Sequence, residues 1–132
     1  ATDIAFDEIH KLYFSLKPEY RSNAIWVMND KTALALRELK DSTNNYLWRG
    51  AADTLLGKPV VISNHMPSAE SGAKPVVFGD FKYYWVVQRQ PLSIRALHEK
   101  YSFADKIVYF GMETLDGCLI RSEAINALQM TE

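Results

Sequence analysis

The segment Lys58-Pro59-Val60-Val61-Ile62-Ser63 marks the point where the sequence changes from helical to extended periodicity. A short apolar run bounded by turn residues is typical of a buried strand, so this segment predicts one. Working outward, further strands are predicted at residues 75–79, 83–90 and 93–97. Residues 64–74 are rich in proline, serine and glycine, which predicts an exposed loop between the first two strands.

Helical patterns come before these strands. Apolar residues recur at steps of three and four over residues 3–17, which predicts a helix that Thr2 or Asp3 caps and Pro18 ends. Residues 24–28 have the length and composition of a strand, and Asn29-Asp30 then caps a second helix that runs to Lys40. Helices early and strands late predict an α+β fold.

Asp116-Gly117 lies between two apolar runs near the end of the chain. Asp-Gly supplies the positive φ angles of a two-residue hairpin turn, so we expect residues 107–110 and 118–120 to be the arms of a hairpin. Gly111 inside the first arm predicts a bulge or bend. Residues 122–130 fit either a strand or a helix.

The length and charge of the chain restrict its function. The 132 residues suit one domain, and 15 basic against 16 acidic residues give a net charge of −1. Without a basic excess, binding to nucleic acid through phosphates is disfavoured. Cys118 is the only cysteine, which excludes an intrachain disulfide and a multi-thiolate metal site. No apolar run approaches the roughly 18 residues of a membrane helix, so no membrane partner is expected.

Motifs that carry chemistry are absent from the sequence. His10, His65 and His98 lack metal-ligand spacing, and the sequence contains neither a nucleophile elbow nor a phosphate-binding glycine loop. Cys118 could act as a nucleophile, but a small hydrophobic residue on a strand is the favoured interpretation. We therefore predict no catalytic, cofactor-binding or metal-binding residues, no cofactor, and no enzyme.

The aromatic content allows three interpretations of one segment. Basic and aromatic residues are mixed along residues 82–89, which are predicted to form a strand. Such a strand could stack single-stranded nucleic acid, could bury one face in a core, or could contact other proteins, because aromatic residues and arginine are enriched at protein interfaces. The charge balance disfavours the first interpretation.

Four phrases in a fixed order carry a family resemblance. They are residues 26–30 with 36–41 and 46–48, Leu55-Leu56-Gly57-Lys58-Pro59-Val60-Val61-Ile62-Ser63 with Met66-Pro67, Val77-Phe78-Gly79-Asp80-Phe81-Lys82-Tyr83-Tyr84, and residues 116–118 running to 123–125. Together they resemble the C-terminal half of the major capsid proteins of tailed bacteriophages, which have the Hong Kong 97-type fold. The resemblance covers residue 5 to the end. Ser122 stands where the family commonly has proline, which indicates a distant member.

The resemblance implies a structural subunit of an icosahedral phage or prophage capsid, made in the bacterial host cytoplasm and located in the virion. Its partners would be further capsid subunits, in pentamers and hexamers, with a scaffold or protease domain possible and packaged DNA met only indirectly. The alternative is an encapsulin-type shell around protein cargo, and a lower-ranked one is a single-stranded nucleic-acid-binding module. The family's N-terminal arm, extended loop and spine helix are missing, so residues 1–132 are expected to be a fragment that forms a monomer or small oligomer by itself.

The resemblance also implies a division of the fragment and a contact surface. Residues 3–97 would form the axial-type domain, and residues 98–132 the returning strands of the peripheral-type domain. Either loop, 41–50 or 64–74, would point toward the capsomer axis. Some members join their subunits by Lys–Asn isopeptide bonds assisted by a Glu that Glu113 could match, but Lys106 stands at the acceptor Asn, so no such bond is expected. The candidate capsomer interface consists of Tyr46, Trp48, Arg49, Asn64, His65, Met66, Lys82 and Tyr84.

Overall fold

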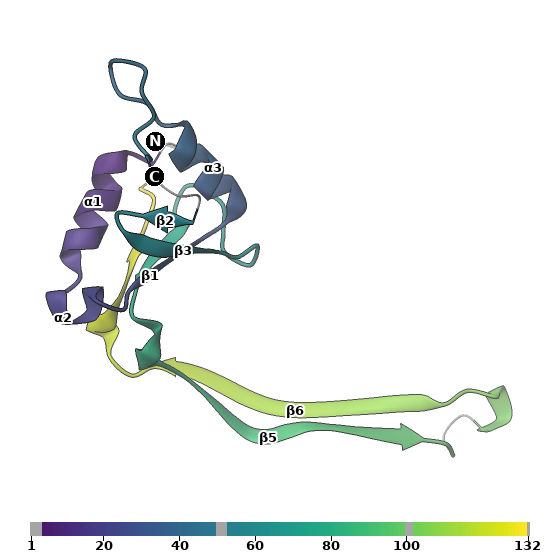
Figure 1. Cartoon of the computed structure of the whole chain (residues 1–132). Helices are drawn as coiled ribbons and strands as arrows, with labels where there is room; N and C mark the ends of the chain where they lie inside the picture. Colours follow the sequence, from purple (N-terminus) through teal and green to yellow (C-terminus); the bar gives the residue numbers. More distant parts are fainter. Residues whose placement is uncertain (1–3, 50–52, 100–101, 132) are drawn as a thin grey trace. The chain divides into compact units, whose positions relative to one another are not determined.

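The computed structural model describes residues 4–49, 53–99 and 102–131, which belong to two compact units. Unit 1 combines residues 1–83 with 121–132, and unit 2 consists of residues 84–120. Figure 1 shows helices and a sheet in unit 1 and a long two-stranded ribbon in unit 2. The units have other boundaries than the expected division at residue 97, because residues 84–97 pair within unit 2.

A five-stranded mixed sheet forms the centre of unit 1. Its spatial order is β2-β3-β1-β4-β7, and only β1 and β3 are parallel. The strands predicted at 24–28, 58–63 and 75–79 are confirmed, whereas the short β2 was not predicted. The tail, which the sequence pattern left open, forms a 3-10 turn and an edge strand. The strand bounds are β1 (Ile25–Met28), β2 (Thr54–Leu55), β3 (Lys58–Ile62), β4 (Val76–Gly79) and β7 (Ile125–Leu128).

In the described residues, three α-helices accompany the sheet, namely α1 (Phe6–Ser15), α2 (Pro18–Arg21) and α3 (Asp30–Glu38). Both predicted helices are confirmed with shorter bounds, while the proposed caps Thr2 and Asp3 lie outside the described residues. Pro18 does more than end the first helix, because it also begins α2, where a proline costs no helical hydrogen bond. Within the described part of the chain, no helix is both long and apolar enough to cross a membrane.

The core of unit 1 lies on one face of the sheet. Trp26 of β1 and Phe78 of β4 are register partners, and their rings stack with centroids 4.1 Å apart. Tyr13 of α1 stacks on the other side of Phe78 at 5.4 Å, so three rings form a continuous column. The Trp26 indole N–H donates to the Leu55 carbonyl oxygen at 2.9 Å. Because strands alternate in side-chain direction, the opposite face carries Val27, Val61 and Val77, none of which is fully buried.

Unit 2 is a ribbon of two antiparallel strands, β5 (Tyr84–Leu97) and β6 (Val108–Leu119). A 3-10 turn, η1 (Phe81–Tyr83), precedes it, and η2 (Ser102–Ala104) lies between its strands. The predicted Asp116-Gly117 hairpin turn is wrong, because both residues lie inside β6 and pair with Val87 and Val86. A Cβ at Gly117 would lie 2.5 Å from the Tyr84 hydroxyl oxygen, so this glycine makes room for the Tyr84 ring instead.

The irregularity of the ribbon also lies elsewhere than predicted. Gly111 pairs in register with Ile94, and the register shifts fall on β5, between Gln88 and Gln90 and between Gln90 and Ser93. Pro91 lies in this interval. Proline has no N–H to donate to a ladder, so a shift in register is the place where a strand tolerates it.

Candidate functional site

The loop 39–49 that follows α3 is a narrow hairpin stabilised by its own polar groups. Lys40 and Tyr46 form an antiparallel bridge, and the Lys40 ammonium lies 4.8 Å from the centre of the Tyr46 ring. The Leu47 N–H donates to the Leu39 carbonyl oxygen at 2.9 Å. The ring of Tyr46 remains 54% exposed, so the loop presents an aromatic side chain to solvent.

Asp41 organises the tip of this loop. Its Oδ1 accepts hydrogen bonds from the Thr43 N–H at 2.8 Å, the Thr43 hydroxyl at 2.7 Å and the Asn45 N–H at 2.9 Å. These donors favour the ionised carboxylate and lower the pKa of Asp41 to about 2, with the Asn45 N–H as the largest cause. Asn44 has a φ of 64°, a left-handed conformation that asparagine adopts more readily than most residues.

The loop tip should therefore lose order only in strong acid. Because the folded pKa of Asp41 is lowered, its stabilising effect is complete above the ordinary value of 3.8 and is lost as the pH falls through about 2. We expect NMR titration to move the Asp41 carboxyl and the Thr43 and Asn45 amide signals together, with a midpoint of about 2. In Asp41→Asn the same amides should show no such titration. A midpoint near 3.8 for Asp41 would mean that the loop is open in solution.

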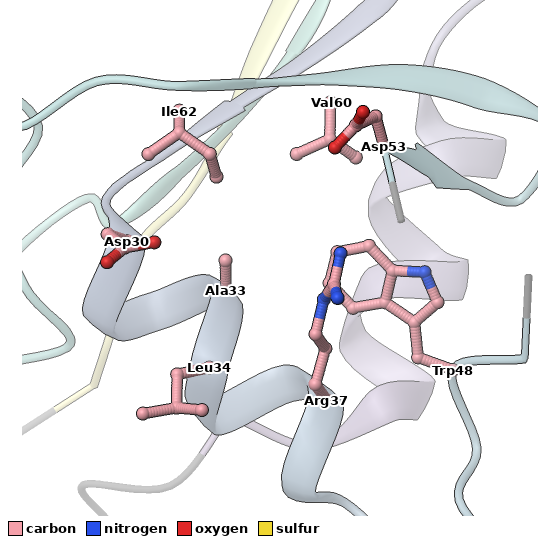
Figure 2. Close-up of a pocket in the computed structure, with 8 residues that line it drawn as sticks. All are labelled: Asp30, Ala33, Leu34, Arg37, Trp48, Asp53, Val60 and Ile62. Carbon is pink, nitrogen blue, oxygen red and sulfur yellow. The ribbon is translucent and has the colours of Figure 1, made fainter. Parts of the chain in front are cut away.

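A groove of about 410 Å³ lies between α3 and β3. Figure 2 shows the Arg37 guanidinium across the face of the Trp48 indole, 4.8 Å from its centre. The Trp48 indole N–H donates to the Thr54 carbonyl oxygen at 2.8 Å, and the Arg49 Nε donates to the Tyr46 carbonyl oxygen at 3.1 Å. Tyr46, Trp48 and Arg49 therefore belong to one locally ordered surface. The groove is lined by Asp30, Ala33, Leu34, Arg37, Trp48, Asp53, Val60 and Ile62.

The second predicted loop contacts the other end of α3. Asn29 caps this helix by accepting from the Lys31 N–H at 3.0 Å, and its Nδ2 donates to the Met66 carbonyl oxygen at 2.9 Å. Asn64 and His65 are exposed in the turn before Met66. The two loops therefore lie at opposite ends of one helix, as Figure 1 shows.

Lys82 and Tyr84 do not join this surface. Lys82 is in η1, which lies at the end of unit 1 away from the loop 39–49 (Figure 1), and its N–H donates to Asp80 Oδ1 at 3.0 Å. Tyr84 is the first residue of β5 and belongs to the ribbon. The eight predicted residues thus fall into separate groups. Two groups adjoin α3, namely Tyr46, Trp48 and Arg49 after its end and Asn64, His65 and Met66 near its start. Lys82 is in η1 and Tyr84 is in unit 2.

The ribbon presents a larger apolar surface than segment 82–89, for which contact with other proteins was one predicted role. Of the 21 exposed large hydrophobic side chains among the described residues, 15 lie between Tyr84 and Ile120. Trp85, Val86 and Val87 are consecutive and are 58%, 64% and 58% exposed. Successive strand residues face opposite sides, so both faces of the ribbon are apolar. The continuous apolar run 83–87 was the available signal, since strands covered on both faces have such runs.

The alternation of side chains along β5 argues against a surface on which nucleic-acid bases could stack. Tyr84 and Trp85 are adjacent on β5 and therefore face opposite sides of the ribbon. Gln88 lies on the Tyr84 side, where its Nε2 donates to Glu113 Oε1 at 2.6 Å. The aromatic residues of segment 82–89 thus do not share one face. Among residues 4–49, 53–99 and 102–131, no three His, Cys, Asp or Glu side chains are grouped as metal ligands would be.

Comparison with known proteins gives a consistent picture. The model of the phage capsid family matches residues 1–130. Two solved structures, the capsids of an empty and of a native GTA particle, are 31% and 32% identical to this chain, each with a TM-score of 0.85. A structure from Gordonia phage Cozz is 14% identical with a TM-score of 0.69, and at that identity it supports the fold alone. No curated protein matches the sequence.

These matches extend over nearly all of the chain. The alignments cover 98% of it but only 45% of each GTA capsid chain and 47% of the Gordonia phage chain, so it spans less than half the length of these proteins. The predicted α+β fold and the resemblance to capsid proteins are both confirmed. With its family model matched from residue 1 to residue 130, the chain belongs to the phage capsid family.

Proposed function

We propose that this chain is part of a structural subunit of an icosahedral phage or prophage capsid, located in the virion and without enzymatic activity. Family membership and the likeness to the GTA capsids support this role. Within it, unit 1 would be the axial-type domain, and the ribbon would supply the returning strands of the peripheral-type domain.

The observation that carries the proposal is the uncovered ribbon. An isolated two-stranded ribbon is marginally stable in water, and its apolar side chains gain about 25 cal/mol for each Å² removed from solvent. None of its described residues is buried within the chain. A shell subunit would cover these faces with other parts of the capsid, and many modest contacts of this kind add up in a closed assembly.

The loops at the two ends of α3 are our candidates for contacts within a capsomer. They present an exposed aromatic ring, an arginine and small polar groups, which is the composition of a protein interface. In pentamers and hexamers each subunit would meet its neighbours through this surface. The candidate residues are Tyr46, Trp48 and Arg49 after α3 and Asn64, His65 and Met66 before β4, while Lys82 would lie apart from them and Tyr84 would act with the ribbon.

Assembly of the complete gene product in bacteria tests the role of the ribbon. Ile94→Glu and Phe110→Glu place a charge on opposite faces, at side chains that are 66% and 51% exposed. Each change should abolish particles in electron microscopy and leave small species in sedimentation velocity, because a buried unpaired carboxylate costs several kcal/mol per copy. Phe14→Glu is the matched control on unit 1, since Phe14 is 65% exposed, and it should still assemble.

The contents of the particles separate the capsid from its alternative. DNA inside purified wild-type particles supports a phage or prophage capsid, whereas protein cargo without DNA would favour an encapsulin-type compartment. Normal particles from both ribbon variants would overturn the proposed role of the ribbon.

A further inference from the structure

The ribbon is an insertion in unit 1, so the chain leaves unit 1 after Tyr83 and returns at Arg121. Both crossings are made by 3-10 turns, η1 and η3 (Ser122–Ala124). Inside unit 1, the residue before η1 is bonded to η3, because the Asp80 N–H donates to the Ala124 carbonyl oxygen at 2.9 Å. The Ala124 N–H in turn donates to the Arg121 carbonyl oxygen at 3.1 Å.

One side chain of α2 contacts both crossings. Tyr20 is 5% exposed, and its ring meets the ring of Tyr83 edge to face, with centroids 5.2 Å apart. The Tyr20 hydroxyl donates to Glu123 Oε1 at 3.0 Å. A buried ring from a helix near the N-terminus thus touches the residue before the insertion and a residue just after it.

The Glu123 carboxylate contacts two cationic side chains beside the insertion points of the ribbon. Its Oε2 is ion-paired with the Lys17 ammonium, and the Arg121 guanidinium lies 3.7 Å from its Oε1. The hydrogen bond from Lys17 is the main reason that the pKa of Glu123 is lowered, followed by the hydrogen bond from Tyr20. Lys17 and Glu123 are 58% and 42% exposed, so water and salt reach the pair.

We propose that Lys17, Tyr20, Tyr83, Arg121 and Glu123 form a charge-dependent latch at the insertion points of the ribbon. With Glu123 ionised, the latch holds η3 and the start of β7 against α2 and η1. Neutralising Glu123, or screening its charge, releases η3 from α2 and η1. Strand β7 still pairs with β4, so release at the latch does not require unfolding of unit 1. This device is independent of the proposed function, because its test needs no particles.

Hydrogen exchange of two amides tests the latch in the full chain. Glu123→Gln should raise the exchange rates of the Ala124 and Asp80 amides about two- to fivefold, the range expected from exposed ion pairs. Lys17→Gln breaks the same pair from the other partner and should act alike. In the wild type, 1 M salt should raise these rates, since the screening length falls to about 3 Å, while Glu123→Gln should respond little.

Glu113→Gln is the matched control, because it makes the same change on the ribbon, where Glu113 Oε1 accepts a hydrogen bond from Gln88 Nε2. It should leave the Asp80 and Ala124 amides unchanged. The Trp26 amide in the core should also exchange at the wild-type rate in every variant. Unchanged Asp80 and Ala124 rates in both Glu123→Gln and Lys17→Gln, or an equal rise at all amides of unit 1, would overturn the latch.

Discussion

Trp26→Ala is expected to destabilise unit 1 by about 4 kcal/mol, within the range for removing a large aromatic side chain from a core. Trp26 has no exposed surface and stacks on Phe78, which itself stacks on Tyr13. The change leaves a cavity at the Trp26 end of this column. It also removes the hydrogen bond from the indole N–H to the Leu55 carbonyl oxygen.

Urea unfolding followed by far-UV circular dichroism measures this loss. A loss of that size approaches the whole stability of many small domains, so the variant is expected to be partly unfolded at 37 °C. Trp85→Ala is the matched control, because Trp85 is 58% exposed on the ribbon and its removal should leave the unfolding midpoint of unit 1 almost unchanged. A loss below about 1 kcal/mol for Trp26→Ala would show that the column of rings is not the centre of the core.

Gly79→Ala is expected to cost about 3 kcal/mol, at the upper end of overpacking costs, although it adds a single methyl group. A Cβ at Gly79 would clash with the Ala124 carbonyl oxygen and lie 2.5 Å from the Cα of Ile125. Both obstacles are backbone atoms of the segment that enters β7, so no side-chain rotation relieves the contact. The edge strand β7 must shift away, which weakens its ladder with β4 and the hydrogen bond from the Asp80 N–H to the Ala124 carbonyl oxygen.

The same unfolding measurement, with hydrogen exchange along β7, checks this expectation. Gly111→Ala is the control, since its added Cβ would meet only the Leu92 side chain, at 3.9 Å, and its cost should stay within about 0.5 kcal/mol. Alanine has a higher strand propensity than glycine, so propensity alone would make Gly79→Ala stabilising. That result would mean that β7 does not pack against Gly79 in solution.

Several elements could be predicted because their signals are local. The apolar stripe on α1, the apolar runs of β1, β3 and β4, and the Asn29 cap of α3 all arise from neighbouring residues and short-range rules. The family could be recognised in the same way, since ordered phrases such as Leu55–Ser63 followed by Val77–Phe81 are read directly from the chain.

The wrong prediction of a turn at Asp116-Gly117 shows what neighbouring residues alone do not determine. Asp-Gly permits a tight turn, but whether one forms depends on which strand pairs with these residues. Here the partners are Val87 and Val86, some 30 positions away, and the Tyr84 ring occupies the space beside Gly117. A pattern that is compatible with two backbone conformations is resolved only by such distant contacts.

The candidate surfaces divide in the same manner. Tyr46, Trp48 and Arg49 are close in sequence and form one surface, whereas Lys82 lies in η1 and Tyr84 begins β5 of the other unit. The full extent of the exposed apolar ribbon could not be predicted, because apolar strands usually indicate a core and the sequence does not report what covers a strand.

Local periodicity, capping and the order of characteristic phrases therefore settled the family and most helices and strands from the amino-acid sequence alone, but not β2, the tail or the pairing of Asp116-Gly117. The order of the five strands, the insertion of the ribbon between η1 and η3, and the exposure of both ribbon faces were decided only in the tertiary structure. The physical reason is that residues far apart in the chain set the hydrogen-bond partners and the burial of each strand. These long-range contacts stabilise the protein only once the chain has folded.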